Sequence, residues 1–269
     1  MIYSDRELSK KLERAEARAN ADFVETRARL QPESGACWID VAGAYAMFDG
    51  VESPCTQTFG LGLFDEIGGE YFDRLEVFFM ERGAPVFHEV SPMADPVLMP
   101  TLVERGYRPI ELTSVMYREV ADDTPENKDS KIVTRVINDD EVETWARTSA
   151  NGWVTEHESL ADFMFNFGQV SAQCAGSYPW LAEIASSPVA TGMMFVHEGI
   201  AVLAGASTVP DARNRGAQSA LLSARLRFAA EKGCKLAMMG ASPGSQSQKN
   251  AQKNGFNIAY TRIKWKMTD

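Results

Sequence analysis

The chain has 269 residues, 45% of them hydrophobic, and a formal net charge of −10 at pH 7. This apolar content is sufficient for buried cores, and the length predicts two domains or one large one. The acidic balance argues against nucleic acid as the main partner, because binding to a phosphate backbone requires a basic face.

The sequence carries no sign of a membrane segment, a disulfide framework or a metal centre. Its N-terminal part lacks an apolar signal-peptide region, and no stretch approaches the ~18 apolar residues that a membrane span requires. We therefore expect a cytoplasmic protein. The cysteines have no C-x-x-C spacing and no histidine stands near them, so neither disulfides nor a metal site is expected; they are Cys37, Cys55, Cys174 and Cys234.

The predicted elements begin with a long helix whose apolar positions recur three or four residues apart, at Leu8, Leu12, Ala15, Ala19 and Phe23. Two strands follow, over residues 37–48 and 55–64. The segment from Phe78 to Tyr117 then reads as the end of a helix, a glycine stop, a strand, a Ser-Pro turn, a short helix, a second glycine stop and a strand.

A polar, charged stretch without apolar periodicity, residues 121–130, predicts a linker. After it we expect a strand over 131–138 and a helix over 139–153. Further strands are expected over 180–185, 191–196 and 200–209. The strands over 191–196 and 200–209 are predicted to form a hairpin with its tip at 197–199.

The second half of the chain repeats a pattern of the first. The segment from Arg227 to Trp265 has the same order of elements as the segment from Phe78 to Tyr117, and three anchors recur at separations of 149 to 151 positions. The anchors are Gly83 with Gly233, Ser91-Pro92 with Ser242-Pro243, and Gly106-Tyr107 with Gly255-Phe256. A period this long predicts two similar domains, 1–120 and 131–269, joined by the linker 121–130.

A strand, a turn rich in arginine and glycine, and a helix occupy residues 200–231. A helix that opens directly after such a turn leaves unpaired N–H groups at the positive end of its dipole, which is an anion site suited to a diphosphate. Glycine lets the backbone approach a phosphate, and arginine adds charge-assisted donors. The residues concerned are Arg213, Asn214, Arg215, Gly216, Ala217, Gln218 and Ser219.

The matching turn of the first copy, residues 64–72, has the opposite character. It carries Asp65, Glu66 and Glu70 where a phosphate would need donors. Carboxylates at a helix start are good caps and poor phosphate ligands. We therefore expect the first domain to keep the fold without the anionic ligand.

The strand, R-x-x-G-x turn and helix, followed by S-x-S-Q-x-N-x-x-x-x-G-F at 245–256, resemble the GNAT superfamily of acyl-CoA-dependent N-acetyltransferases. The resemblance covers Lys131 to Lys266 and extends, through the repeat, to a degenerate copy over Cys37 to Arg118. It implies an α/β fold of two tandem GNAT-like domains. Each would have a central mixed, mostly antiparallel sheet flanked by helices.

The resemblance also implies how acetyl-CoA is held. The strand over Ile200–Val209 would splay from its neighbour and offer backbone groups, including those of Thr208 and Val209, to the pantetheine and the thioester carbonyl. The turn over Arg213–Gln218, with Ser219, would bind the pyrophosphate, although Gln218 stands where the family has glycine or alanine. Ser247 and Asn250 would contact the donor from the following helix.

The implied reaction transfers an acetyl group directly to a primary amine in a ternary complex, because no cysteine lies in a motif typical of an acyl-enzyme. The position where the family often has a catalytic tyrosine is Ala251, so its role passes to Tyr260, Ser247, water or no group. Glu183 is the first candidate for the general base, with His197 and Glu198 as alternatives. A glutamate on a strand is more often a solvated residue than a base, which is the alternative for Glu183, and core packing is the alternative for Tyr260.

A second function stays open, since the missing tyrosine is also compatible with a catalytically inactive acyl-CoA-binding or scaffold protein. A nucleotide-binding module is disfavoured because both G-x-x-x-x-G-K-[ST] and G-x-G-x-x-G are absent. The acceptor is expected to be a small-molecule or peptide amine. The protein is expected to be a monomer or a homodimer without nucleic-acid or membrane partners.

Overall fold

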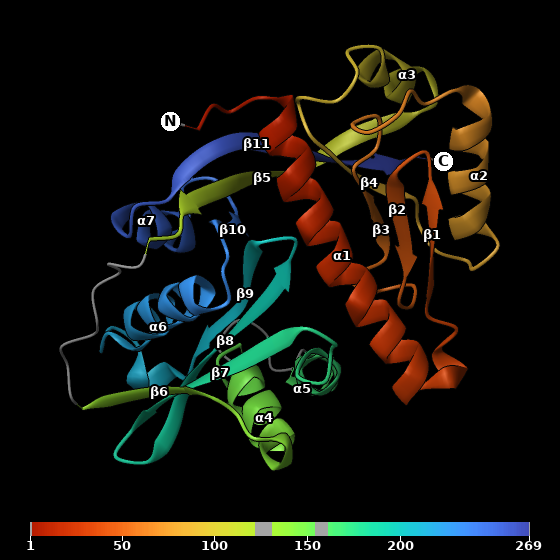
Figure 1. Cartoon of the computed structure of the whole chain (residues 1–269). Coiled ribbons are helices and arrows are strands. Elements are labelled where there is room, and N and C mark those ends of the chain that lie inside the picture. The colour runs from red at the N-terminus through yellow and green to blue at the C-terminus, as the bar shows by residue number, and fades with distance from the viewer. Residues whose placement is uncertain (1, 122–130, 154–160, 269) are drawn as a thin grey trace. The chain divides into compact units, whose positions relative to one another are not determined.

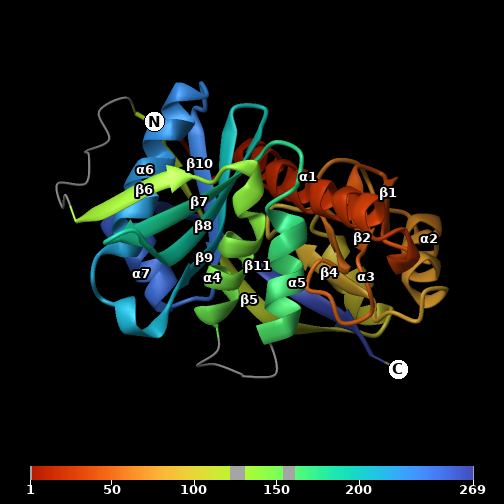
Figure 2. The ribbon, with the colours of Figure 1, turned by 90° about the horizontal axis from the view of Figure 1, so that it is seen from below.

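The computed structural model describes residues 2–121, 131–153 and 161–268 and divides into two compact units. Unit 1 contains the chain up to Tyr117 together with the segment from Gly240 onward, and unit 2 contains Arg118 to Met239. The linker expected over 121–130 lies, apart from Ala121, outside the described residues. Figures 1 and 2 give two views of the chain.

Unit 1 is built on a mixed sheet with the strand order β1-β2-β3-β4-β11-β5. Strands β3 and β4 are parallel, and the other neighbours in this order are antiparallel. Its elements are α1 (Arg6–Leu30), η1 (Pro32–Ser34), β1 (Cys37–Val41), β2 (Ala44–Phe48), β3 (Gln57–Phe59), α2 (Gly69–Met80), β4 (Phe87–Val90), α3 (Leu98–Glu104), β5 (Tyr107–Glu119), whose last two residues fall in unit 2, α7 (Gln246–Lys253) and β11 (Asn257–Met267).

Helix α1 forms where the apolar periodicity predicted it. Asp5 caps its first turn, with Asp5 Oδ1 accepting a hydrogen bond from the Leu8 N–H over 2.9 Å. Leu8, Leu12 and Phe23 are buried along one face of the helix. In Figure 1 the helix runs beside strands β1 to β3, which it contacts.

The strand expected over 37–48 is a hairpin, β1 and β2, and the expectation of a single strand was wrong. Ala42 and Gly43, with φ of 50° and 77°, form its two-residue turn. Tight hairpin turns of this kind need positive φ at both central residues, and the Ala-Gly pair gave a weaker signal than Asn-Gly would. The next strand, expected over 55–64, is reduced to β3 because positive φ angles at Gly60 and Gly62 turn the chain away.

The two faces of the unit 1 sheet bury different sets of side chains. Helices α2 and α3 cover a core that includes Val41, Phe72 and Trp265. Helix α1 covers the opposite face, where the Arg14 guanidinium lies 4.3 Å from the centre of the Tyr45 ring. The alternation of side chains along the strands separates these layers.

Unit 2 has the strand order β10-β9-β8-β7-β6, antiparallel except between β9 and β10. Its elements are β6 (Ile132–Val136), η2 (Asp139–Glu141), α4 (Val142–Asn151), α5 (Ala161–Ser171), β7 (Ser177–Ile184), β8 (Ser187–His197), β9 (Ile200–Thr208), η4 (Pro210–Ala212), α6 (Ala217–Glu231) and β10 (Leu236–Ala241), whose last two residues fall in unit 1. The hairpin tip predicted at 197–199 is confirmed between β8 and β9.

Helices α6 and α4 cover opposite faces of the unit 2 sheet. Trp180 and Ala182 belong to the core under α6, whereas Leu181 belongs to the core under α4. Trp145 anchors α4 by donating from Nε1 to the Trp180 carbonyl oxygen over 3.0 Å. In Figure 2, α4 and α5 lie side by side, and they contact each other.

The predicted repeat is present as two runs of the same elements. The run α2-β4-α3-β5 matches α6-β10-α7-β11, and the glycine stops at Gly83, Gly106, Gly233 and Gly255 all have positive φ. The predicted α/β class with mixed, mostly antiparallel sheets is confirmed. The expected division at 121–130 stays a prediction, and β11 pairs with β4 and β5 of unit 1. Among the described residues, no helix has the length and apolar character needed to span a bilayer.

Candidate functional site

The turn between β9 and α6 presents a helix start without a capping side chain or an acidic residue in its first turn. The first helical hydrogen bond runs from the Ala220 N–H to the Gly216 carbonyl oxygen over 3.0 Å. The N–H groups of Ala217, Gln218 and Ser219 therefore have no intrahelical acceptor and lie at the positive end of the helix dipole. Ser219 is exposed. The three N–H groups can donate hydrogen bonds to an anion.

Gly216 makes this abrupt start possible. Its φ is 86°, a left-handed conformation that other residues adopt at a cost. A Cβ built on Gly216 would lie 3.6 Å from Ile132 Cδ1, an ordinary contact. The requirement for glycine therefore comes from the backbone angle and not from crowding. Asn214, two residues earlier, also has positive φ, at 61°, and is exposed.

The two arginines of the turn differ in their surroundings. Arg213 donates from Nη2 to the Gly152 carbonyl oxygen over 2.8 Å and so ties the turn to the end of α4. Arg215 is exposed and makes no ion pair with any residue that the structure describes. The guanidinium of Arg215 is therefore the more available of the two for an anionic ligand.

Gln218 points its side chain inward. Its Nε2 lies 2.7 Å from the Ser207 carbonyl oxygen, 3.2 Å from the Thr191 carbonyl oxygen and 3.1 Å from Thr208 Oγ1. The amide thus ties α6 to Thr191 in the middle of β8 and to the end of β9. What Gln218 offers outward is its backbone N–H. Val209 is similarly engaged, because its N–H donates to the Val189 carbonyl oxygen over 3.0 Å.

Strand β9 parts from β10 beyond its first residues. The parallel pairing joins Ile200–Val202 to Leu236–Met238 and extends no further among the described residues. The register with β8 also shifts, since Gly205 and Ala206 of β9 stand opposite the single residue Gly192. This is a β-bulge, and Gly205 has a φ of 60°. Residues 204–206 are exposed although they lie in the middle of a strand.

Three features of this region were not anticipated from the sequence: the bulge, Gly152 and Arg225. A Cβ on Gly152 would fall 1.8 Å from Ser207 Oγ, so glycine allows the end of α4 to approach β9. An isolated glycine inside an apolar strand, here Gly205, is a known sign of a bulge and was the available signal. Arg225 was passed over, although it follows Leu221 by one helical turn on the buried stripe of α6.

Glu183, the expected base, lies on β7 and forms an ion pair with Arg135. Arg135 Nη2 donates to Glu183 Oε1 over 2.8 Å, and the same guanidinium binds Glu141. The hydrogen bond from Arg135 lowers the pKa of Glu141 to about 2. Glu183 is thus oriented by a cation. No described contact joins it to the turn at the start of α6, and its catalytic role stays a prediction.

Tyr260, the expected acid, belongs to unit 1 and is buried. Its hydroxyl donates to Glu13 Oε1 over 2.8 Å, and burial raises its pKa well above the ordinary value. Ser247 and Asn250 are exposed on α7, also in unit 1, and Asn250 Oδ1 accepts from Gln246 Nε2 over 2.8 Å. Ala251, at the position where the family often has tyrosine, is buried. The functional roles of these residues stay predictions.

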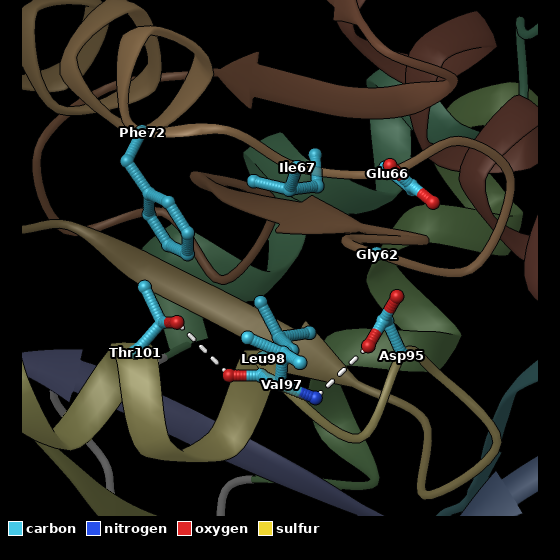
Figure 3. A pocket seen from close by; sticks show the side chains of 8 residues that line it. All are labelled: Gly62, Glu66, Ile67, Phe72, Asp95, Val97, Leu98 and Thr101. Atoms are coloured by element: carbon cyan, nitrogen blue, oxygen red, sulfur yellow. Dashed lines mark hydrogen bonds between the residues drawn. The ribbon is translucent and has the colours of Figure 1, made fainter.

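The matching turn of the first copy borders a pocket of about 270 Å³ in unit 1. Figure 3 shows the side chains of Glu66 and Asp95 toward one end of this pocket and Phe72 toward the other. Asp95 Oδ1 accepts from the Val97 N–H over 2.9 Å, and none of the described residues that line the pocket is basic. An anionic ligand would meet carboxylates here, which agrees with the charge reversal between the two turns.

No protein-family model and no curated protein matches this sequence. Solved structures do match. A GCN5-related N-acetyltransferase from Kribbella flavida has 17% identity over 91% of this chain and 95% of its own, with a TM-score of 0.65. A GCN5-related N-acetyltransferase from Sphaerobacter thermophilus has 17% identity over 84% of this chain and 77% of its own, with a TM-score of 0.56.

A tandem GNAT protein from the clavulanic acid biosynthesis pathway covers the whole chain. It has 10% identity over 100% of this chain and 98% of its own, with a TM-score of 0.58. The chain therefore has the fold of the GCN5-related N-acetyltransferases in its tandem form. The tandem GNAT-like fold implied by the sequence resemblance is confirmed.

Proposed function

We propose that the protein transfers the acetyl group of acetyl-CoA to a primary amine by direct transfer in a ternary complex. The observation that carries this proposal is the uncapped start of α6 beside the parted end of β9. Its N–H groups and the exposed guanidinium of Arg215 suit a diphosphate. The fold is shared with solved structures named as N-acetyltransferases and supports the same function.

In this reaction the amine nitrogen attacks the thioester carbonyl, the new C–N bond forms, and the C–S bond breaks to release the thiolate. The backbone of β9 around its bulge would hold the donor, and an N–H there would stabilise the oxyanion. An amine with a pKa of about 10.4 is protonated at pH 7, so a base must remove a proton. Glu183 remains our candidate base and Tyr260 our candidate acid.

Titration calorimetry with acetyl-CoA tests the donor. We expect micromolar binding that Arg215→Ala weakens roughly tenfold or more, because a charge-assisted hydrogen bond is lost. Arg147→Ala is the matched control, since Arg147 is an exposed arginine of α4 paired with Glu143. No detectable binding at low micromolar protein, or equal effects of the two variants, would rule the donor site out.

Release of free thiol tests transfer. Polyamines, amino acids, aminoglycosides and peptide N-termini would be screened as acceptors against the hydrolysis background. Glu183→Gln should lower kcat if the carboxylate acts as the base, and Tyr260→Phe should do so if the hydroxyl acts as the acid. Full activity in either variant removes that residue from the mechanism.

An inactive acyl-CoA-binding or scaffold protein is the second candidate. It is favoured by the buried alanine at position 251 and by the engagement of the Tyr260 hydroxyl with Glu13. This candidate predicts calorimetric binding of acetyl-CoA without thiol release for any acceptor. Steady turnover with one amine would exclude it.

A further inference from the structure

Arg225 is a cation buried inside unit 2. It lies on α6 with 2% of its surface exposed, and it forms no ion pair with any carboxylate that the structure describes. Burial lowers its pKa to about 10. Placing an uncompensated charge in a core is costly, so its hydrogen bonds must account for its presence there.

Those hydrogen bonds go to the backbone beside the β9 bulge. Arg225 Nη1 donates to the Met193 carbonyl oxygen over 3.0 Å and to the Ala204 carbonyl oxygen over 3.3 Å. Arg225 Nε donates to the Leu221 carbonyl oxygen of its own helix over 3.3 Å. Met193 and Ala204 are the pair at which the β8–β9 register resumes after the shift. The guanidinium thus supports carbonyl groups at the place where the bulge interrupts the ladder.

Gly192 leaves the space that the guanidinium occupies. A Cβ built on Gly192 would lie 2.7 Å from Arg225 Cζ and 2.9 Å from Nη1. Gly192 is also the residue of β8 that faces the two bulge residues Gly205 and Ala206. Gly192, the β9 bulge and the buried guanidinium of Arg225 therefore lie next to one another in unit 2.

We propose that Arg225 is a positioning residue that fixes the β9 bulge and, through it, the backbone groups of residues 204–206 that meet the thioester. The inference rests on the proposed acetyl transfer. The pyrophosphate turn is a separate part of the site, so Arg225 controls the rate of transfer more than the affinity for acetyl-CoA. Replacing a side chain that only filled the core would not lower the rate of transfer while leaving the affinity for acetyl-CoA nearly unchanged.

Three variants test this role. Arg225→Met keeps most of the volume and removes every donor, Arg225→Lys retains one ammonium, and Gly192→Ala crowds the guanidinium without altering its charge. Arg227→Met is the control, because it makes the same change two positions along α6 at a partly exposed site. If Arg225→Met does not fold, Gly192→Ala and Arg225→Lys test the positioning role of Arg225 instead.

Steady-state kinetics provide the first readout. Arg225→Met should lower kcat on the order of 100-fold, comparable to the loss of one oxyanion-hole donor. KM for acetyl-CoA should change less than about threefold, and Arg225→Lys should recover part of kcat. A normal kcat in the Arg225 variants, a loss confined to KM, or an equal loss in Arg227→Met would overturn the proposal.

Hydrogen exchange of the amides in residues 203–208, measured without acetyl-CoA, provides the second readout. Exchange should speed up in Arg225→Met and Gly192→Ala and stay unchanged in Arg227→Met. If the unaltered protein binds no acetyl-CoA, the proposed function fails, while this comparison still decides whether Arg225 holds the bulge. Unchanged exchange in both Arg225→Met and Gly192→Ala would refute the role of Arg225.

Discussion

Replacing Glu13 by glutamine should change the pH dependence of stability. Glu13 lies on α1, fully buried, with Oε1 accepting from Tyr260 and from Arg262 Nη1 over 3.2 Å. Arg262 also binds Glu16 and Glu89, so one cation faces three carboxyl groups. Burial raises the pKa of Glu13 from 4.5 to about 7, and burial also raises that of Glu89.

The sign and size of the effect follow from proton linkage. Below pH 4.5 Glu13 is protonated in both the folded and the unfolded chain, and its contribution to stability is fully present. Between pH 4.5 and 7 the folded state retains a proton that the unfolded state has lost, so stability falls as pH rises. At 1.36 kcal/mol per pKa unit, the total loss is about 3 kcal/mol.

Urea denaturation between pH 5 and 8 measures this contribution. Glu13→Gln resembles the protonated carboxyl at every pH, so its free energy of unfolding relative to the unaltered protein should rise across this range by about 3 kcal/mol or somewhat less. Glu7→Gln, on the exposed side of the same helix, is the control and should give a flat difference. A flat difference for Glu13→Gln, or the same rise in both variants, would refute the reasoning.

Three further predictions, which use four substitutions, test the fold. Arg262→Met leaves buried carboxylates without their cation and should destabilise by about 3–5 kcal/mol at pH 7 in urea denaturation, and by less at pH 5; equal losses would contradict the charge argument. Gly216→Ala should lose about 1–2 kcal/mol from its positive φ and weaken acetyl-CoA binding in calorimetry; an unchanged melting midpoint would show that α6 tolerates another start. Ala42→Gly should stabilise by up to about 1 kcal/mol in thermal melts, whereas Ala44→Gly inside β2 should destabilise, and the reverse order would count against the turn assignment.

The parts of the fold that could be predicted from the sequence are those set by local pattern. The apolar stripe of α1, the glycine stops and the hairpin tip at Glu198-Gly199 depend on residues close together in the chain. The turn at Ala42-Gly43 was missed because alanine rarely adopts positive φ, and only the surrounding strands enforce it.

Side-chain roles in the candidate site depend on distant partners and could not be predicted. Gln218 points inward because its side-chain amide donates to backbone carbonyl groups of β8 and β9. Tyr260 meets Glu13 across 247 positions of sequence, which no local pattern reveals. The position of Arg225 on the buried stripe of α6 is visible in the sequence, but its partners Met193 and Ala204 follow from the pairing of β8 with β9.

The position of β11 between β4 and β5 has a consequence for how the chain is made. Residues of α1 and β1 to β4 leave the ribosome well before residues 257–267 are synthesised. Until then the sheet of unit 1 lacks an inner strand, and Glu13 has neither Arg262 nor Tyr260 beside it. The segment with α1 and β1 to β4 therefore stays incompletely folded until residues 257–267 have been synthesised. A fragment cut near residue 118 would expose the edges of β4 and β5 to pairing with other chains.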